Sequence, residues 1–335
     1  MDLYLNYHND FERLYNCTGI DPSKYGSSNV VVGSGQLTIG IALEIMCIPC
    51  MIVLTQKELR QYSCYKLMFL LGFFDMATLI VNSIINGYFS IKGAIFCTYP
   101  QFMYFSGVAA IGLWCSTCMT SVILGINRAV DLWFPSVTDF LFQGNRTYLW
   151  CAVPFAYGGF MSWKSKSFIF STRGYALYTS PYEDIDWLNV DTERYHSSYH
   201  TFNNFSVMII TSAIYIILAV SVWYKTKNIN TQKITKIQKQ LIYQSCAICS
   251  FIIVSDAIYV YAQYYTAPPL LVILGHSCWI ACHGSAVVIY FTCNETIQSG
   301  VFELLRIKKF NTMFSSKVVQ VTVAENTECA LHKTV

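Results

Sequence analysis

Charged side chains are scarce in this chain: Asp, Glu, Lys and Arg make up 12% of its 335 residues, about half of what soluble domains carry. This scarcity, together with 54% hydrophobic residues, excludes an ordinary soluble domain. The formal net charge is only +3 and no continuous basic surface alternates with aromatics, so we expect no nucleic-acid partner. Internal repeats and low-complexity segments are also missing. No basic segment followed by an apolar core opens the chain, so we expect no cleavable signal peptide.

What the chain has instead is a series of seven apolar runs separated by polar loops. A hydrocarbon core of about 30 Å needs roughly 20 helical residues, and a helix satisfies its own backbone hydrogen bonds in lipid. We therefore predict an all-α fold, a seven-transmembrane helix bundle over residues 33–293, between an extracellular segment 1–32 and a cytoplasmic segment 294–335. The predicted spans are 33–55, 66–88, 99–127, 148–165, 204–224, 240–264 and 270–293.

The distribution of basic residues predicts the orientation of the bundle. Positive residues near helix ends are retained on the cytoplasmic side. Of the 22 Lys and Arg residues, one side has seven, diluted by carboxylates: Arg13, Lys24, Lys92, Lys164, Lys166, Arg173 and Arg194. The other fifteen fall on the opposite side, in three loops and the C-terminal segment. The N-terminus is therefore predicted to lie outside and the C-terminus inside.

Most of the 14 cysteines fall inside the predicted helices, where we interpret them as small apolar packing residues. A zinc site would need four converging ligands within lipid. Only Cys17 and Cys97 lie in exposed, oxidising segments, so they are the candidate disulfide. Asn16 begins a glycosylation sequon, Asn-Cys-Thr, in the outer segment.

Five ionisable residues stand out in the interior of the predicted spans: Glu44, Asp75, Asp256, His276 and His283. Such residues are costly in lipid, about 2.5 to 3.5 kcal/mol on insertion scales, and by default mark pathways, partners or switches. Asp75 lies at mid-depth and needs a proton, an ion or a polar neighbour. His276 and His283 share one face of the last helix, which raises the alternative of an intramembrane metallohydrolase. That reading needs at least three protein ligands, so the third would have to be Asp75, Glu44 or Asp256.

The inner end of the third run closes with Asn127-Arg128. Arg128 fits equally an anchor at the membrane surface and a latch that bridges helices in one state only. After the last run, residues 294–310 have helix-like apolar spacing followed by cations, which predicts a short amphipathic helix with its apolar face in the inner leaflet. The outer loop 166–203 is aromatic and acidic without a secondary-structure signal, so it is either a lid or a mobile segment.

Short motifs spread over nearly the whole chain are together specific to one family. They are Tyr15-Asn16-Cys17, Ile48-Pro49-Cys50, Tyr65-Lys66-Leu67-Met68-Phe69 with Gly72 and Asp75, Gly93 to Pro100, Leu113-Trp114, Asn127-Arg128, His283-Gly284 with Ile289-Tyr290, and Asn294-Glu295-Thr296-Ile297. On these residues the chain resembles the nematode serpentine receptors of class T, chemoreceptor-type G-protein-coupled receptors.

The resemblance implies a receptor of the plasma membrane rather than an enzyme. By the same resemblance, we expect the receptor in the sensory cilia of neurons. Its outer half would bind an extracellular small molecule or peptide, and its inner face a heterotrimeric G protein, with no cofactor or metal. Asp75 is similar to the mid-membrane aspartate of rhodopsin-like receptors, and Asn127-Arg128 stands where those receptors carry Asp-Arg-Tyr. We expect the switch and the coupling to use Asp75, Asn127, Arg128, Tyr290 and Asn294.

Three departures from the rhodopsin-like pattern accompany this resemblance. Ala286-Val287 stands in place of the Asn-Pro expected before Tyr290, the sixth run lacks a kinking proline, and the second outer loop has no cysteine to bridge to the third helix. A channel or transporter remains the second alternative, although no paired broken helices of the kind found in transporters are visible.

We expect a ligand pocket among the outer halves of the third, sixth and seventh runs, because ligand pockets are largely apolar with few polar groups. The candidate pocket residues are Met103, Tyr104, Trp114, Tyr261, Tyr264, His276 and Trp279.

Overall fold

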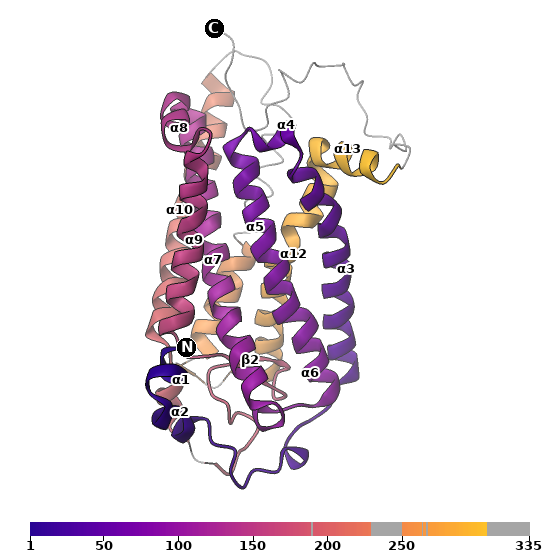
Figure 1. The fold of residues 1–335 in the computed structure, drawn as a ribbon, viewed down its shortest axis with the longest axis vertical. Helices are drawn as coiled ribbons and strands as arrows, with labels where there is room; N and C mark the ends of the chain where they lie inside the picture. The colour runs from indigo at the N-terminus through magenta and orange to yellow at the C-terminus, as the bar shows by residue number, and fades with distance from the viewer. Residues whose placement is uncertain (189, 229–249, 263, 266, 307–335) are drawn as a thin grey trace.

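The computed structural model describes residues 1–188, 190–228, 250–262, 264–265 and 267–306. In this part of the chain, seven helical segments run along the long axis of the molecule (Figure 1). They are α3 (Val30–Leu54), a composite of α5 (Ser63–Leu79), η2 (Ile80–Ile85) and α6 (Asn86–Lys92), α7 (Pro100–Trp133), α9 (Arg146–Lys164), α10 (Ser198–Asn228), the helix Ser250–Ala262 and α12 (Pro269–Cys293). The prediction of an all-α bundle is confirmed.

Local chemistry explains several helix ends. Asn29 accepts a hydrogen bond from the Val32 amide and so caps α3. Pro100 and Pro269 stand in the first turns of α7 and α12, where a missing amide hydrogen is harmless. Helix α6 ends at Gly93, whose φ of 61° is a left-handed conformation that glycine adopts without a Cβ penalty.

Two helices extend beyond the predicted spans. Helix α7 continues past Arg128 to Trp133, so the Asn127-Arg128 pair lies inside the helix and does not end it. Helix α10 begins at Ser198, which places residues of the predicted outer loop on a helix. The sixth predicted span, 240–264, is described only in its second half.

Helices α7 and α9 approach closely because both carry glycine where they cross. A Cβ on Gly112 would lie 2.0 Å from Oγ of Ser162, and one on Gly158 would lie 1.9 Å from Oγ of Ser116. Small residues of this kind let helix backbones approach within membranes, where apolar side chains gain nothing from leaving lipid for each other.

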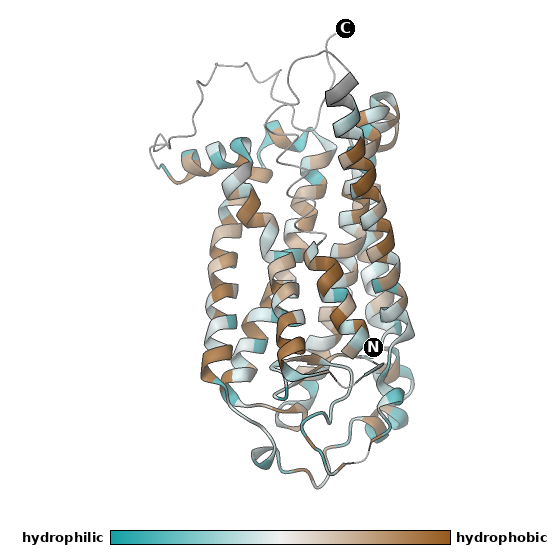
Figure 2. Cartoon of the chain, turned by 180° about the vertical axis from the view of Figure 1, so that it is seen from behind, coloured by the Kyte–Doolittle hydropathy of each residue, from teal (hydrophilic) through white to brown (hydrophobic). Residues whose placement is uncertain are grey.

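The outward faces of the bundle are apolar. Large exposed hydrophobic side chains follow α3, among them Ile45 at 63% and Ile48 at 50% exposure. Among the described residues, five helices are long and apolar enough to cross a membrane, and the helix Ser250–Ala262 is apolar but shorter in its described part. Figure 2 shows hydrophobic residues along the helices and more hydrophilic ones toward the two ends. Such a surface is stable in lipid and unsuited to water.

One end of the bundle carries the N-terminal segment and the loop between α9 and α10 (Figure 1). Helices α1 (Asp2–Asn6) and α2 (His8–Leu14) begin the chain, and η1 (Pro22–Lys24) and η3 (Phe96–Thr98) are single turns. In the loop, β1 (Ile169–Ser171) pairs antiparallel with β2 (Ala176–Tyr178), and η4 (Thr192–Tyr195) follows. This hairpin had no signal in the sequence, because three-residue strands are too short to give a pattern.

The opposite end carries the short helices α4 (Lys57–Arg60), α8 (Pro135–Phe142) and α13 (Glu295–Leu304) (Figure 1). Asn294 caps α13 by accepting a hydrogen bond from the Ile297 amide at 2.8 Å. Ile297 and Val301 are 0% and 1% exposed and pack into the same apolar cluster as Val53 of α3. The prediction that the apolar face of this helix lies in lipid was therefore wrong for these two residues, since the bundle itself covers them.

Candidate functional site

A cavity lies among α7, α10, α12 and the helix Ser250–Ala262, with about 300 Å³ of empty space when the part open to solvent is included. Phe168, just before β1, also contributes to its wall. The other lining residues are Ala110, Ile111, Trp114, His200, Asn204, Ser255, Asp256, Tyr259 and Trp279. The lining is mostly apolar with a few polar groups, as in small-molecule sites.

The loop between α9 and α10 reaches this cavity because it crosses α7 at a glycine, Gly107. A Cβ on Gly107 would lie 1.7 Å from the carbonyl oxygen of Phe168, so only glycine lets the loop backbone cross there. Next to that crossing, Oγ of Ser167 donates to the Tyr104 carbonyl oxygen at 2.7 Å. These contacts hold the Phe168 ring against His200, with ring centroids 4.7 Å apart.

A hydrogen-bonded chain orders the polar side of the cavity. Trp114 Nε1 donates to Asn204 Oδ1 at 3.1 Å, and Asn203 Nδ2 donates to the same oxygen at 3.1 Å. Tyr157 of α9 donates its hydroxyl hydrogen to Asn203 Oδ1 at 2.9 Å. Asn204 Nδ2 lies 3.3 Å from His200 Nε2. Helices α7, α9 and α10 are thus joined through one asparagine pair.

Two of the seven predicted pocket residues, Trp114 and Trp279, line the cavity. His276 stands behind it, because its Nδ1 lies 3.0 Å from the hydroxyl of the lining residue Tyr259. The remaining four lie elsewhere and require correction.

Tyr104 and Met103 are each 1% exposed and belong to the apolar cluster beneath the N-terminal segment. The Tyr104 ring contacts Tyr15 and Phe11, with centroids 5.1 and 4.9 Å apart. Tyr261 and Tyr264 are 43% and 51% exposed. Choosing residues by depth along a helix was insufficient, because depth does not decide which face of the helix points inward.

Sequence reasoning missed Phe168, His200, Asn204 and Tyr259 as lining residues. Only Asp256 gave a signal, as an acid within an apolar run. It is 2% exposed, and its Oδ2 has no hydrogen-bond partner among the described residues.

Below the cavity, His276 joins α12 to the composite helix. Its Nε2 donates to the Asn82 carbonyl oxygen at 2.8 Å, while Nδ1 accepts from the Tyr259 hydroxyl. Asn82 lies in η2, a π-helical segment. π-Helical turns of this kind depart from regular α-helical pairing and often occur at functional sites.

One pair of buried ionisable groups lies at the centre of the bundle. His283 Nδ1 is 2.7 Å from Asp75 Oδ1, and the residues are 1% and 5% exposed. The His283 ring also meets two lining residues of the cavity edge-on, with centroid distances of 5.7 Å to Trp114 and 6.1 Å to Trp279. The structure therefore links the cavity to Asp75 through direct side-chain contacts.

Toward the end of the bundle that carries α4, the remaining predicted switch residues have separate environments. Asn127 donates to Ser63 Oγ at 3.1 Å, and the Arg128 guanidinium lies 3.7 Å from Met68 Sδ. Both contacts tie α7 to α5. Tyr290 is 4% exposed and within electrostatic range of Arg128 and Asp75. Asn294 is a helix cap, which is a structural role.

The N-terminal segment covers the start of α7. A disulfide joins Cys17 to Cys97, just before α7 begins. The hydroxyl of Tyr195 donates to the Leu14 carbonyl oxygen at 2.7 Å, and that of Tyr182 to the Asn16 carbonyl oxygen at 2.8 Å. These bonds tie the segment to the loop after α9. The Asn16 side chain is exposed, as glycosylation requires.

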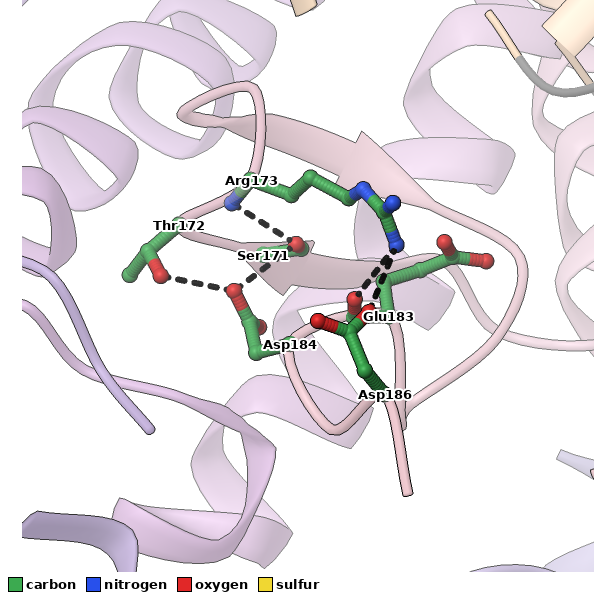
Figure 3. Close-up of polar contacts among 6 residues, drawn as sticks. All are labelled: Ser171, Thr172, Arg173, Glu183, Asp184 and Asp186. Atoms are coloured by element: carbon green, nitrogen blue, oxygen red, sulfur yellow. Dashed lines mark hydrogen bonds and ion pairs between the residues drawn. The ribbon is translucent and has the colours of Figure 1, made fainter. Parts of the chain in front are cut away.

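Figure 3 shows how polar contacts hold the hairpin against the turn that follows it. Asp184 Oδ1 accepts hydrogen bonds from Thr172 at 2.6 Å and Ser171 at 3.1 Å. Arg173 Nη1 lies 3.3 Å from both the Glu183 carbonyl oxygen and Asp186 Oδ1. Burial raises the pKa of Asp184, opposed by the hydroxyl donors, and also raises that of Glu183, opposed by Arg173.

No group of three or more His, Cys, Asp or Glu side chains within the described ranges is arranged to hold a metal ion. His276 and His283 have separate partners, Asn82 and Asp75. The geometry therefore gives the metallohydrolase alternative no support.

An apolar-faced bundle of seven helical segments, with a cavity near one end and a buried polar pair below it, defines the class of multi-pass membrane receptors. The chain matches the family described as serpentine type 7TM GPCR chemoreceptor Srt over residues 2–314, and it belongs to that family. It is similar to the Serpentine receptor class T-55 of Caenorhabditis elegans, with 19% identity over 300 residues, covering 88% of this chain and 80% of that protein.

Proposed function

We propose that this receptor resides in the plasma membrane with its N-terminus outside, binds a small external stimulus in the cavity, and activates a heterotrimeric G protein at the end that carries α4, α8 and α13. The observation that supports this most directly is the contact route from Trp114 and Trp279 through His283 to Asp75. A ligand shifts an equilibrium only through its different affinities for two states. A ligand that repacks these rings would change the surroundings of the buried pair.

The inner residues extend this proposal. Asn127 and Arg128 of α7 contact α5, and Tyr290 of α12 lies near both Arg128 and Asp75. Rotation or translation of α12 relative to α5 would alter the surroundings of all three residues. Small shifts become discrete states because packed interiors are bistable.

The test uses the full-length receptor in lipid nanodiscs with purified G-protein heterotrimers from a panel of α subunits. A screen of diverse odorants and peptides should yield a stimulus that accelerates GTPγS binding. His283→Gln removes the ring contacts but retains an amide facing Asp75, so we expect a several-fold loss of stimulated exchange. Ser277→Ala, an exposed position on the same helix, is the matched control.

Two outcomes would count against the proposal. Unchanged maximal exchange in His283→Gln would show that the route carries no signal. A stimulus-evoked ion current in vesicles that contain no G protein would favour the channel alternative instead.

A further inference from the structure

Asp256 is the unexplained group of the cavity. Its carboxyl is 2% exposed, lines the cavity, and leaves Oδ2 without a hydrogen-bond partner in the described residues. Asp75, by contrast, has His283. Buried carboxylates in an apolar setting are found paired or hydrogen-bonded because an isolated charge there is very unfavourable. The partner of Asp256 is therefore a proton or a group that enters the cavity.

The other polar side chains of the lining are already engaged. Trp114 fixes the orientation of the Asn204 amide by donating to its oxygen, so the amide nitrogen faces His200 Nε2. The Asn204 amide thereby engages His200 in the same hydrogen-bonded chain. Ser255 Oγ lies 3.4 Å from the Gly275 carbonyl oxygen, and the Tyr259 hydroxyl donates to His276. Asp256 is the one acidic side chain among the described lining residues.

Aromatic rings line the same cavity as this acid. Trp279 stands nearly perpendicular to Trp114 and to Tyr259, at 89° and 81°, with centroids 6.1 and 5.9 Å away. Phe168 lies 6.3 Å from Tyr259. Rings arranged in this way attract cations through their faces, and the attraction grows when water is excluded.

We propose that the cavity binds a small protonated monoamine, whose ammonium group pairs with Asp256 while its hydrocarbon part packs among Trp114, Phe168, Tyr259 and Trp279. This assignment of a ligand class rests on the proposed role of the cavity as the stimulus site. The empty space of the cavity, about 300 Å³ with the part open to solvent included, is an upper limit that restricts the ligand to a compact molecule and excludes a folded peptide. The Trp279 indole N–H, which also has no partner among the described residues, is a donor and gives a second ammonium group no acceptor.

Three ring compounds of nearly equal shape separate the possibilities: cyclohexylamine, cyclohexanol and trans-1,4-diaminocyclohexane. Purified receptor in nanodiscs, without G protein, is titrated with each while thermal unfolding and tryptophan fluorescence are followed. Cyclohexylamine should raise the unfolding temperature and change the fluorescence at concentrations up to about 10 mM. Cyclohexanol and the diamine should bind at least roughly tenfold more weakly.

Asp256→Asn should weaken cyclohexylamine binding by at least roughly tenfold and abolish the preference over cyclohexanol. Glu44→Gln is the matched control, because it removes another mid-membrane carboxyl that does not line the cavity. Equal binding of amine and alcohol to the wild-type receptor would overturn the proposal and indicate a protonated Asp256. Absence of amine binding over this range, or undiminished binding by Asp256→Asn, would also overturn it.

The binding readout contains no G protein, so it separates this proposal from the proposed function. Amine binding without nucleotide exchange would refute coupling and leave the ligand class standing. Exchange driven by another stimulus, without amine binding, would refute the ligand class alone. The ligand series on the wild-type receptor decides the question even where Asp256→Asn fails to fold.

Discussion

At the scale of single residues, the three acids within the predicted spans have different surroundings. Asp75 is paired with His283, Asp256 faces a cavity, and Glu44 has one buried oxygen without a partner in the described residues. A buried pair keeps its geometry because separating the partners leaves a charge uncompensated. Asp75 is thus suited to hold α5 and α12 in one arrangement, whereas Asp256 is suited to meet a ligand.

We expect Asp75→Asn to change the balance of inactive and active states without abolishing surface expression. The amide keeps the shape of the side chain but removes the charge that faces His283, so basal exchange should change several-fold, within a typical coupling energy of about 1 to 3 kcal/mol. Arg128→Ala should lower maximal activation, because its contact with α5 is lost. The measurement is paired ligand binding and GTPγS exchange at matched surface expression.

These two substitutions should alter efficacy more than intrinsic affinity, since neither residue lines the cavity. Normal basal and maximal signalling from both variants would instead assign the residues a structural role only.

The loop carboxyls predict a pH dependence. Burial raises the pKa of Asp184 above its ordinary value, so the folded loop favours the protonated form. The resulting stabilisation is complete below the ordinary pKa and is lost as the pH rises through the raised one. Asp184→Asn, which cannot ionise, should therefore gain loop stability relative to wild type as the pH rises above the ordinary pKa of about 4, by roughly 1 kcal/mol or less because the side chain is only half-buried.

Hydrogen exchange of residues 167–187, corrected for its intrinsic pH dependence, measures this difference. Asp186→Asn is the control, because this substitution removes a charge from the same turn and the Asp186 side chain is 88% exposed. A difference between wild type and Asp184→Asn that stays constant with pH would contradict the prediction.

At the scale of elements, the N-terminal segment belongs to the folded structure and is not a free tail. Tyr4, Phe11 and Tyr15 form an aromatic cluster with Tyr104 of α7. Lys164 at the end of α9 pairs with Asp2 at 2.9 Å. The segment and the hairpin after α9 together cover the outer end of the helices, with Phe168 reaching the cavity from that cover.

The Cys17–Cys97 bond should contribute strongly to the stability of this cover. It closes a loop across a sequence separation of 80 residues, which in the chain-entropy model stabilises by roughly 4 kcal/mol. Cys17→Ser, Cys97→Ser and the double variant should therefore lower the unfolding temperature equally and speed hydrogen exchange in residues 1–28. Thiols at both positions in peptide maps made without reductant, or additive losses in the double variant, would argue against the bond.

At the scale of the whole molecule, the apolar outward surface and the two polar ends define a body that fits a bilayer. The charge distribution then selects one of two orientations, because basic residues are retained on the cytoplasmic side. Lys57, Arg60 and Arg146 lie on α4 or at the start of α9, at the end opposite the hairpin.

An epitope placed before Met1 should accordingly be stained on intact cells, and one placed after Val335 only after permeabilisation. The physical reason is the fifteen-to-seven split of the 22 basic residues between the two sides. An antibody against a cytosolic protein verifies that intact cells are sealed. Staining of the C-terminal epitope on intact cells would refute the orientation and, with it, G-protein coupling at the α13 end.

Much of the fold could be predicted because lipid imposes a strong one-dimensional constraint: a long apolar run must become a helix that spans the bilayer. The same constraint marked Asp75, Asp256 and His283 as exceptional. It could not show that His283 would meet Asp75, or that Asp256 would face the cavity, because partners 208 residues apart are chosen by how helices pack.

The sequence by itself determined the helical class, the family motifs and the pairing of the two exposed cysteines. These features follow from the composition, the length of each apolar run and the compartment of each cysteine. These properties can be read locally along the chain and allow few alternative structures. Only the tertiary structure decided which helix faces form the cavity, that Tyr104 lies beneath the N-terminal segment, and that Ile297 and Val301 pack on the bundle. The rotation of each helix about its axis sets these contacts, and packing against neighbours fixes that rotation where nearly every face of a helix is apolar.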